Sequence, residues 1–220
     1  MRLLLCDDGV AVFDKPSGLL THASAMAREE DTALTQARHA LGTYVWPLHR
    51  LDRATSGVLA FALERERSMT LSRAFEEGRV SKSYLAIVRG TAPEHVVVDH
   101  AIPKTEGGER VSAVTQIDRV AIGDRVSLVV AQPRTGRFHQ IRRHLKHLGH
   151  PIACDSNYGT GWFNRWMRDE VGLSRLALHA SSLELPRSDQ GRIAVRAPLP
   201  DDLIRALRRL GIDPSAIEAG

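Results

Sequence analysis

Short runs of apolar and β-branched residues recur along the whole chain, and they constrain the fold more than any other feature. Most are bounded by glycine, proline or aspartate, as strands commonly are. A sheet of many strands follows from this pattern. We expect strands at Val10–Phe13, Val58–Ala62, Tyr84–Val88, Val111–Ile117, Arg125–Val130, Leu176–Leu183 and Arg192–Val195.

Helix-like stretches stand between some of these runs, and each is followed closely by glycine. Because strands and helices do not alternate in a regular βαβ order, the pattern favours an α+β fold over a doubly wound one. The sheet should be mixed and mostly antiparallel, with helices flanking it. We expect helices at Thr32–Leu41 behind a cap at Asp31, at Ser68–Glu77, at Arg137–Leu148 and at Asp201–Leu210.

Length and composition set broad limits on this chain of 220 residues. No linker divides it, and the glycine- and charge-rich segment Lys104–Arg110 is typical of a loop, so we expect a single domain over residues 1–220. Two cysteines, Cys6 and Cys154, are too few for a disulfide framework. No run of eighteen apolar residues occurs, so we expect a cytoplasmic protein with no membrane partner.

The segment Arg125–Cys154 is the strongest anomaly in charge, with six Lys or Arg residues, four histidines and no acidic residue. It could be a basic helix face that pairs with acids elsewhere in the chain. It could also follow RNA phosphates, because Lys and Arg release counterions when they bind a nucleic-acid backbone. We expect RNA contacts from Arg137, His139, Gln140 and Lys146. One helix face could carry Arg137, Gln140, His144 and Lys146–His147.

A metal site is a weaker interpretation of the same segment. His144 and His147 are three residues apart, His139 and His150 lie nearby, and Cys154 could supply a thiolate. An HExxH helix and a CxxC pair are both missing, and the surrounding cations would oppose a dication. We therefore expect no metal.

One carboxylate, Asp52, lies between Arg50 and Arg53 in a polar turn just before an apolar run. Arginines and hydroxyl groups would favour its ionised form, so it could act as a nucleophile or a base. It could equally be a structural residue that caps the turn through the amides of Thr55 and Ser56. The residues by themselves leave both interpretations open.

Several segments together resemble the RluA-type pseudouridine synthases. HRLDRATSG resembles their central motif, and TGRFHQIRRHL followed by GHPIACDSNYG resembles the motif that closes their active site. The resemblance spans nearly the whole chain, and its segments are His49–Gly57, Thr135–Leu145, Gly149–Gly159, Phe13–His22, Ser81–Gly90 and Arg175–Pro186.

The resemblance implies the pseudouridine synthase catalytic fold and a role for each matching residue. Asp52 would be the nucleophile, and Arg50 would help to displace the target base from its stack. Tyr84 would stack on the flipped uracil, Arg142 would pair with the catalytic carboxylate, and Leu178 would line an apolar pocket. A base inside a helix must be flipped before chemistry can reach it, and an aromatic face can then hold it. The reaction needs no cofactor.

The resemblance also implies an RNA partner. The doubled arginine of QIRRHLKHLGHPI and the tract Asn164–Ala180 are similar to the branch that modifies tRNA, at position 65. An rRNA target is the alternative. Cys154 departs from the family pattern, because a glycine usually precedes the aspartate there. We expect a monomer without the small N-terminal RNA-binding domain of many relatives.

Two other functions remain as alternatives. The chain could be an RNA-binding module without catalysis, although the set of Arg50, Asp52, Tyr84 and Arg142 is intact. It could also be a hydrolase of the glycosidase type that pairs Asp52 with Asp155, which would require a second acid placed opposite the first.

Overall fold

The computed structural model describes residues 1–23, 31–104 and 108–217. It consists of two compact units, Met1–Lys82 with Ala180–Pro198, and Ser83–His179 with Leu199–Gly220. Both boundaries fall inside strands, one in β5 (Ser81–Arg89) and one in β11 (Leu178–Pro186). The expectation of one domain stays a prediction.

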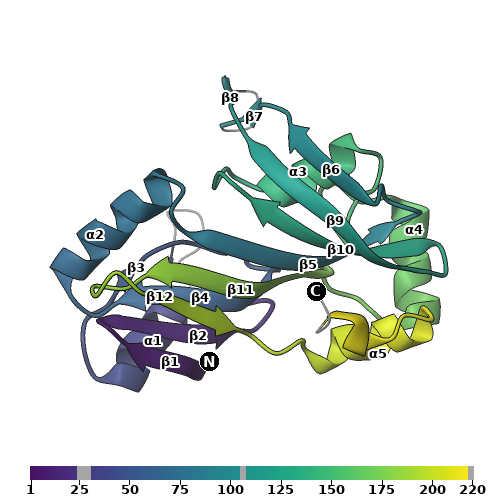
Figure 1. Cartoon of the computed structure of the whole chain (residues 1–220). Helices are drawn as coiled ribbons and strands as arrows, with labels where there is room; N and C mark the ends of the chain where they lie inside the picture. Colours follow the sequence, from purple (N-terminus) through teal and green to yellow (C-terminus); the bar gives the residue numbers. More distant parts are fainter. Residues whose placement is uncertain (24–30, 105–107, 218–220) are drawn as a thin grey trace. The chain divides into compact units, whose positions relative to one another are not determined.

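The first unit is built on strands in the order β1-β2-β4-β11, with β12 paired to β11 and the short β3 paired to β4. Antiparallel pairing joins β1 to β2, β2 to β4, β3 to β4 and β11 to β12 (Figure 1). The remaining bounds in this unit are β1 (Arg2–Asp7), β2 (Val10–Lys15), β3 (Trp46–Pro47), β4 (Ser56–Ala62), β12 (Arg192–Arg196), α1 (Ala33–Leu41) and α2 (Arg65–Glu76).

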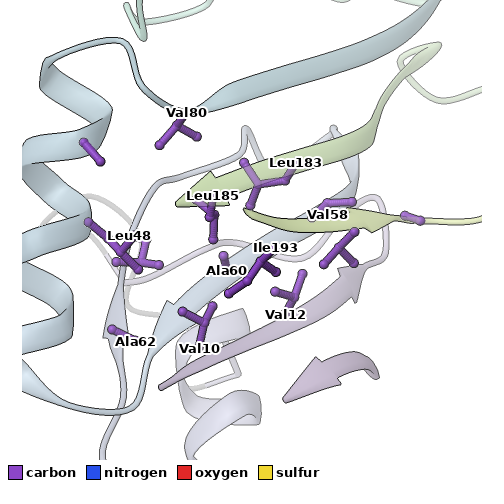
Figure 2. Close-up of a cluster of buried hydrophobic side chains, with 14 residues drawn as sticks. Val10, Val12, Leu48, Val58, Ala60, Ala62, Val80, Leu183, Leu185 and Ile193 are labelled. Carbon is purple, nitrogen blue, oxygen red and sulfur yellow. The ribbon is translucent and has the colours of Figure 1, made fainter. Parts of the chain in front are cut away.

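The core of the first unit lies between the strands and α2. Every residue of β4 is buried, so this strand has apolar neighbours on both faces and shows no alternation. Figure 2 shows Val10, Val12 and Val58 pointing into a cluster with Leu183, to which α2 adds Leu71 and Ala74. Burying each of the larger aliphatic side chains stabilises the fold by about 1.5–3 kcal/mol.

The second unit contains the antiparallel order β5-β10-β9-β6 and a separate pair, β7 with β8. Among its helices, α3 contacts β9 and β10. The bounds are β6 (His95–Asp99), β7 (Ile102–Pro103), β8 (Arg110–Val111), β9 (Val114–Gly123), β10 (Val126–Pro133), α3 (Gln140–His147), α4 (Gly161–Trp166), a π-helix (Met167–Val171), α5 (Asp201–Arg209) and a 3₁₀ turn (Pro214–Ile217).

These elements confirm the α+β class and the mostly antiparallel pairing. The expected strand Val111–Ile117 is wrong in one respect: β8 ends at Val111, and β9 begins only at Val114. The first of these pairs with β7 and the second with β6 and β10, so one apolar run serves two sheets. The loop expected at Lys104–Arg110 connects β7 to β8, and its residues 105–107 lie outside the described part of the chain.

The starts of α1 and α2 differ from the expected ones. The cap of α1 is Thr32, whose hydroxyl accepts from the Thr35 amide in a capping box, while Asp31 accepts from Gln36. Helix α2 begins at Arg65, three residues before the expected Ser68. Its first turn contains no apolar residue to mark it, and the nearly buried Arg67 anchors it by an ion pair with Asp8.

Candidate active site

Asp52 is half-buried and begins a tight turn that leads into β4. The Thr55 amide donates to the backbone carbonyl of Asp52 at 3.0 Å, so the main chain closes this turn. That bond satisfies the Thr55 amide, which was one of the two donors considered for the carboxylate. Arg50, two residues earlier, is exposed.

The segment Lys15–Thr21 holds this turn in place. The fully buried ammonium group of Lys15 donates to the carbonyls of Pro16, Leu19 and Arg53 at 2.8–3.2 Å. Such donation satisfies a buried cation that would otherwise be costly. Ser17 donates to the Ala54 carbonyl at 2.7 Å, so successive carbonyls of the turn are bound. The position of the Asp52 backbone is thereby fixed from one side.

Thr21 fixes the strand-like approach to the turn. Its hydroxyl donates to the carbonyl of Leu51 at 2.9 Å and accepts from the amide of the same residue at 3.1 Å. Both groups are buried, so the pair acts like one rung of a sheet. Sequence reasoning did not single out Lys15 or Thr21, although both lie in the segment Phe13–His22 that carries the family resemblance.

His49 is a neutral part of the framework beneath the turn. Its Nε2 accepts the Ala60 amide at 3.2 Å, and its ring stacks on Phe75 with centroids 5.5 Å apart. Burial, with the charge of Lys82, lowers the pKa of His49 to about 3. Burial also lowers the pKa of Lys82 itself.

Gly57 explains why the motif ends in glycine. Its φ is +111°, and a Cβ built on it would lie 2.1 Å from the Ala180 carbonyl oxygen of β11. Any side chain would force β4 and β11 apart directly after the Asp52 turn.

Arg142 is locked into a buried ion pair within the second unit. Its Nε and Nη2 donate to the two carboxylate oxygens of Asp155, each at 2.8 Å, and Nη2 also donates to Asn157 at 2.8 Å. The side chains of Arg142 and Asp155 are 6% and 0% exposed. Asp155, the residue directly after the acid-free segment Arg125–Cys154, thus supplies a carboxylate to Arg142.

The carboxylate of Asp155 is held in its charged form. Burial raises its pKa, but the Arg142 hydrogen bonds and the amides of Tyr158 and Asn157 outweigh this and bring the pKa below its ordinary value. Asp155 thus fixes the plane of the Arg142 guanidinium, whose carbon lies 5.2 Å from the centre of the Tyr158 ring. The segment GHPIACDSNYG supplies Asp155, Asn157 and Tyr158.

The other expected substrate contacts also lie in the second unit. Tyr84 is half-buried on β5 and pairs with Ala131 of β10. Leu178 is the first residue of β11 and is 3% exposed, and its role in an apolar pocket stays a prediction.

The residues expected to share an exposed face of α3 do not do so. The helix begins at Gln140, so Arg137 precedes it in an exposed loop. Gln140 and His144 are buried on the side facing β9, where Gln140 binds Val114 and Thr115, and His144 binds Thr115. These two side chains serve the fold.

Lys146, by contrast, is exposed, and His139 is half-buried in the left-handed conformation at the helix start. The start is displaced because the side-chain oxygen of Gln140 accepts from the Thr135 hydroxyl and the Arg137 amide, which keeps the preceding residues in a loop.

The residues considered for a metal are engaged otherwise. His144 uses its second ring nitrogen on the His100 carbonyl, at 3.0 Å. The Cys154 thiol donates to the Leu173 carbonyl, and burial raises its pKa to about 11, so it is a poor thiolate donor. Within residues 1–23, 31–104 and 108–217, no group of three or more His, Cys, Asp or Glu side chains could hold a metal ion. In the same ranges, no helix has the length and apolar character of a membrane span.

Residues 9–147 match the family model described as RNA pseudouridylate synthase. The chain belongs to this family. As a member it is an isomerase that acts on uridine in RNA, and the resemblance found in its motifs is confirmed. The chain is 39% identical to tRNA pseudouridine synthase C of Haemophilus ducreyi, over 83% of this chain and 84% of that protein. It is 35% identical to the protein of the same name from Salmonella typhimurium, over 96% and 90%.

Solved structures agree with this pseudouridylate synthase assignment. Human RNA Pseudouridylate Synthase Domain Containing 4 superposes with a TM-score of 0.78 at 26% identity, over 96% of this chain and 93% of that one. Human RNA Pseudouridylate Synthase Domain Containing 1 gives 0.75 at 29% identity, over 90% and 83%.

Proposed function

We propose that this pseudouridine synthase modifies tRNA, with Asp52 as its nucleophile. The observation that carries the choice of tRNA is the similarity to proteins named tRNA pseudouridine synthase C, at 35–39% identity over most of both chains. By the same resemblance the target is the uridine at position 65. We further propose that the enzyme works in the cytoplasm as a monomer.

The chemistry asked of Asp52 fits its setting. Isomerisation breaks the bond between N1 of uracil and the ribose, turns the base, and forms a bond from its C5 to the same ribose carbon. The C5 proton is then lost and N1 takes up a proton, both by exchange with solvent, so the atoms balance without an oxidant or a reductant. A carboxylate on a rigid turn can supply the nucleophile. The turn is rigid because Lys15, Ser17 and Thr21 bind its carbonyls.

The remaining roles follow the motifs. Arg50 is exposed, as a residue that enters the RNA stack must be. Tyr84 would hold the flipped uracil by stacking, and Leu178 would contribute apolar surface. Arg142 would favour the ionised form of the nucleophile, with its guanidinium oriented by Asp155.

The hydrolase alternative fails on the state of Asp155. A glycosidase of that type needs one carboxylic acid that keeps its proton until it protonates the leaving group. Asp155 is buried, and both of its carboxylate oxygens accept hydrogen bonds from Arg142. Its pKa lies below the ordinary value. It is therefore a structural anion.

Mapping pseudouridine in tRNA and rRNA, with and without this gene, tests the substrate. We expect one tRNA pseudouridine to disappear on deletion and to return with the wild-type gene. Loss of an rRNA pseudouridine instead would overturn the tRNA proposal while keeping the enzyme class. Size-exclusion chromatography of the purified chain tests the monomer.

Asp52→Asn tests the nucleophile, because it keeps the shape of the side chain and removes its charge. We expect no detectable product, with RNA affinity and melting temperature close to those of the wild type. Glu184→Gln provides a matched control, since it neutralises a half-buried acid on β11, the strand that pairs with β12. Activity of Asp52→Asn within about tenfold of wild type would reject Asp52 as nucleophile.

A further inference from the structure

Phe138 is an exposed aromatic side chain inside the basic segment Arg125–Cys154. It is 46% exposed and lies in the loop between β10 and α3. The His139 ring stacks on it, with centroids 3.7 Å apart and planes at 22°. The Arg143 guanidinium carbon lies 5.5 Å from the centre of the same ring. A single exposed phenyl ring is common on a protein surface, so its exposure alone indicates no function. What distinguishes Phe138 is that its ring stacks on an imidazole close to a guanidinium.

The loop that carries Phe138 is rigid. On one side of it, the buried Gln140 accepts from the Thr135 hydroxyl at 2.6 Å and from the Arg137 amide at 3.0 Å. The amide group of the same side chain donates to β9, to the carbonyl of Val114 and the hydroxyl of Thr115. Little conformational entropy is left for the loop to lose on binding, which favours its use as a preformed contact.

The residues behind the ring are also fixed. His139 has a φ of +54°, an unfavourable conformation for a residue with a side chain. Its ring contacts the Tyr158 hydroxyl at 3.2 Å, and Arg143 donates to that hydroxyl at 2.9 Å. Arg143 also donates to the Pro103 carbonyl at 2.6 Å. The strained backbone thus stacks an imidazole on Phe138, and the guanidinium of Arg143 is held 5.5 Å from the centre of the same ring.

We propose that Phe138 is a stacking platform for an unpaired base of the RNA substrate. This base differs from the target uridine, for which Tyr84 is proposed. A nucleobase offers a flat π-face to the ring, and the nearby Arg137, which is exposed, is placed to meet its phosphate. The proposal rests on the action of the family on RNA and does not depend on whether that RNA is tRNA.

The test measures RNA affinity in the Asp52→Asn background, so that the bound RNA stays unmodified. The probe is a fluorescently labelled transcript of an RNA on which the wild-type enzyme forms pseudouridine. We expect Phe138→Ala and Phe138→Leu to weaken binding by about five- to a hundredfold, and Phe138→Trp to retain it. Melting temperatures should stay unchanged, because the ring is outside the core. Ile122→Ala, at an exposed apolar residue of β9, is the matched control and should bind like the parent.

Salt dependence separates stacking from charge. Phe138→Ala should leave the slope of log affinity against log salt unchanged, whereas Arg137→Gln should reduce it by about one. In the active enzyme, Phe138→Ala should raise KM and leave kcat nearly unchanged. Wild-type affinity in Phe138→Ala, or equal affinity in Phe138→Leu and Phe138→Trp, would overturn the platform. If the wild type modifies rRNA instead, the same variants are tested on that transcript, so the two proposals fail separately.

Discussion

Replacing Asp155 by asparagine would leave the guanidinium of Arg142 buried without a counter-charge. The two side chains are 0% and 6% exposed, and two hydrogen bonds of 2.8 Å join them. The asparagine oxygen can still accept from the amides of Asn157 and Tyr158 and from Arg142 Nη2, but its NH₂ group would then face the Nε donor of Arg142. Removing one partner of a buried ion pair typically costs about 3–5 kcal/mol. For a chain of this length, that lowers Tm by roughly 6–20 °C.

Thermal and urea unfolding across pH would measure this loss. The pKa of Asp155 is lowered in the folded state, so its contribution is complete above the unfolded value of about 3.9 and disappears as pH falls through the folded pKa. The stability difference between wild type and Asp155→Asn should therefore be largest near neutral pH and shrink below about pH 4. The difference isolates Asp155 from other carboxylates with lowered pKa, such as Asp202.

Two further variants make the reasoning refutable. Glu184→Gln breaks the exposed ion pair with Arg192 and should change stability by no more than about 1 kcal/mol. The double variant Arg142→Met with Asp155→Asn should lose less unfolding free energy than the two single variants lose in sum, because it leaves no buried charge. A Tm loss in Asp155→Asn no larger than in Glu184→Gln would show that the ion pair does not hold this region.

Two other predictions concern single positions. Gly57→Ala should destabilise the protein by at least about 2 kcal/mol in urea unfolding, because its Cβ would meet the Ala180 carbonyl at 2.1 Å in a positive-φ conformation. Gly136→Ala is the control, because a Cβ at Gly136 would lie in open space. An equal loss of stability in both variants would contradict the close approach of Gly57 to Ala180. Burial raises the pKa of Cys154 to about 11, so this thiol should react with iodoacetamide far more slowly at pH 8 in the native protein than after unfolding. Mass spectrometry of the labelled peptides measures both rates, and equally fast labelling of the native protein would contradict the prediction.

Cys154 also shows why a glycine is usual at its position in the family. Its φ is +59°, a conformation that glycine adopts freely and that costs other residues roughly 1–2 kcal/mol. Here the half-buried thiol donates to the Leu173 carbonyl, which offsets part of that cost. The sequence revealed that Cys154 departs from the family pattern, and the positive φ explains why glycine is the usual residue.

The sequence by itself determined the family, the α+β class and most strands of the sheet. Motifs such as HRLDRATSG are contiguous, so they can be recognised in the sequence without the fold. Apolar runs such as Val58–Ala62 can also be recognised there, because a fully buried strand is apolar along its whole length. Local signals also placed the end of α5 within one residue, because Gly211 follows its C-cap Leu210. The sequence alone also identified Asp52 as the candidate nucleophile, because its flanking arginines are adjacent in the chain.

Only the tertiary structure decided which side chains meet. The sequence could not show that Asp155 closes on Arg142, that Lys15 and Thr21 hold the turn of Asp52, or that Gln140 is buried. Helical spacing gave Gln140 and His144 a common face but not its direction, because a polar side chain turns inward only when buried partners satisfy it. Those partners lie on β9 and in the loop after β6, and their proximity is a property of the folded chain alone.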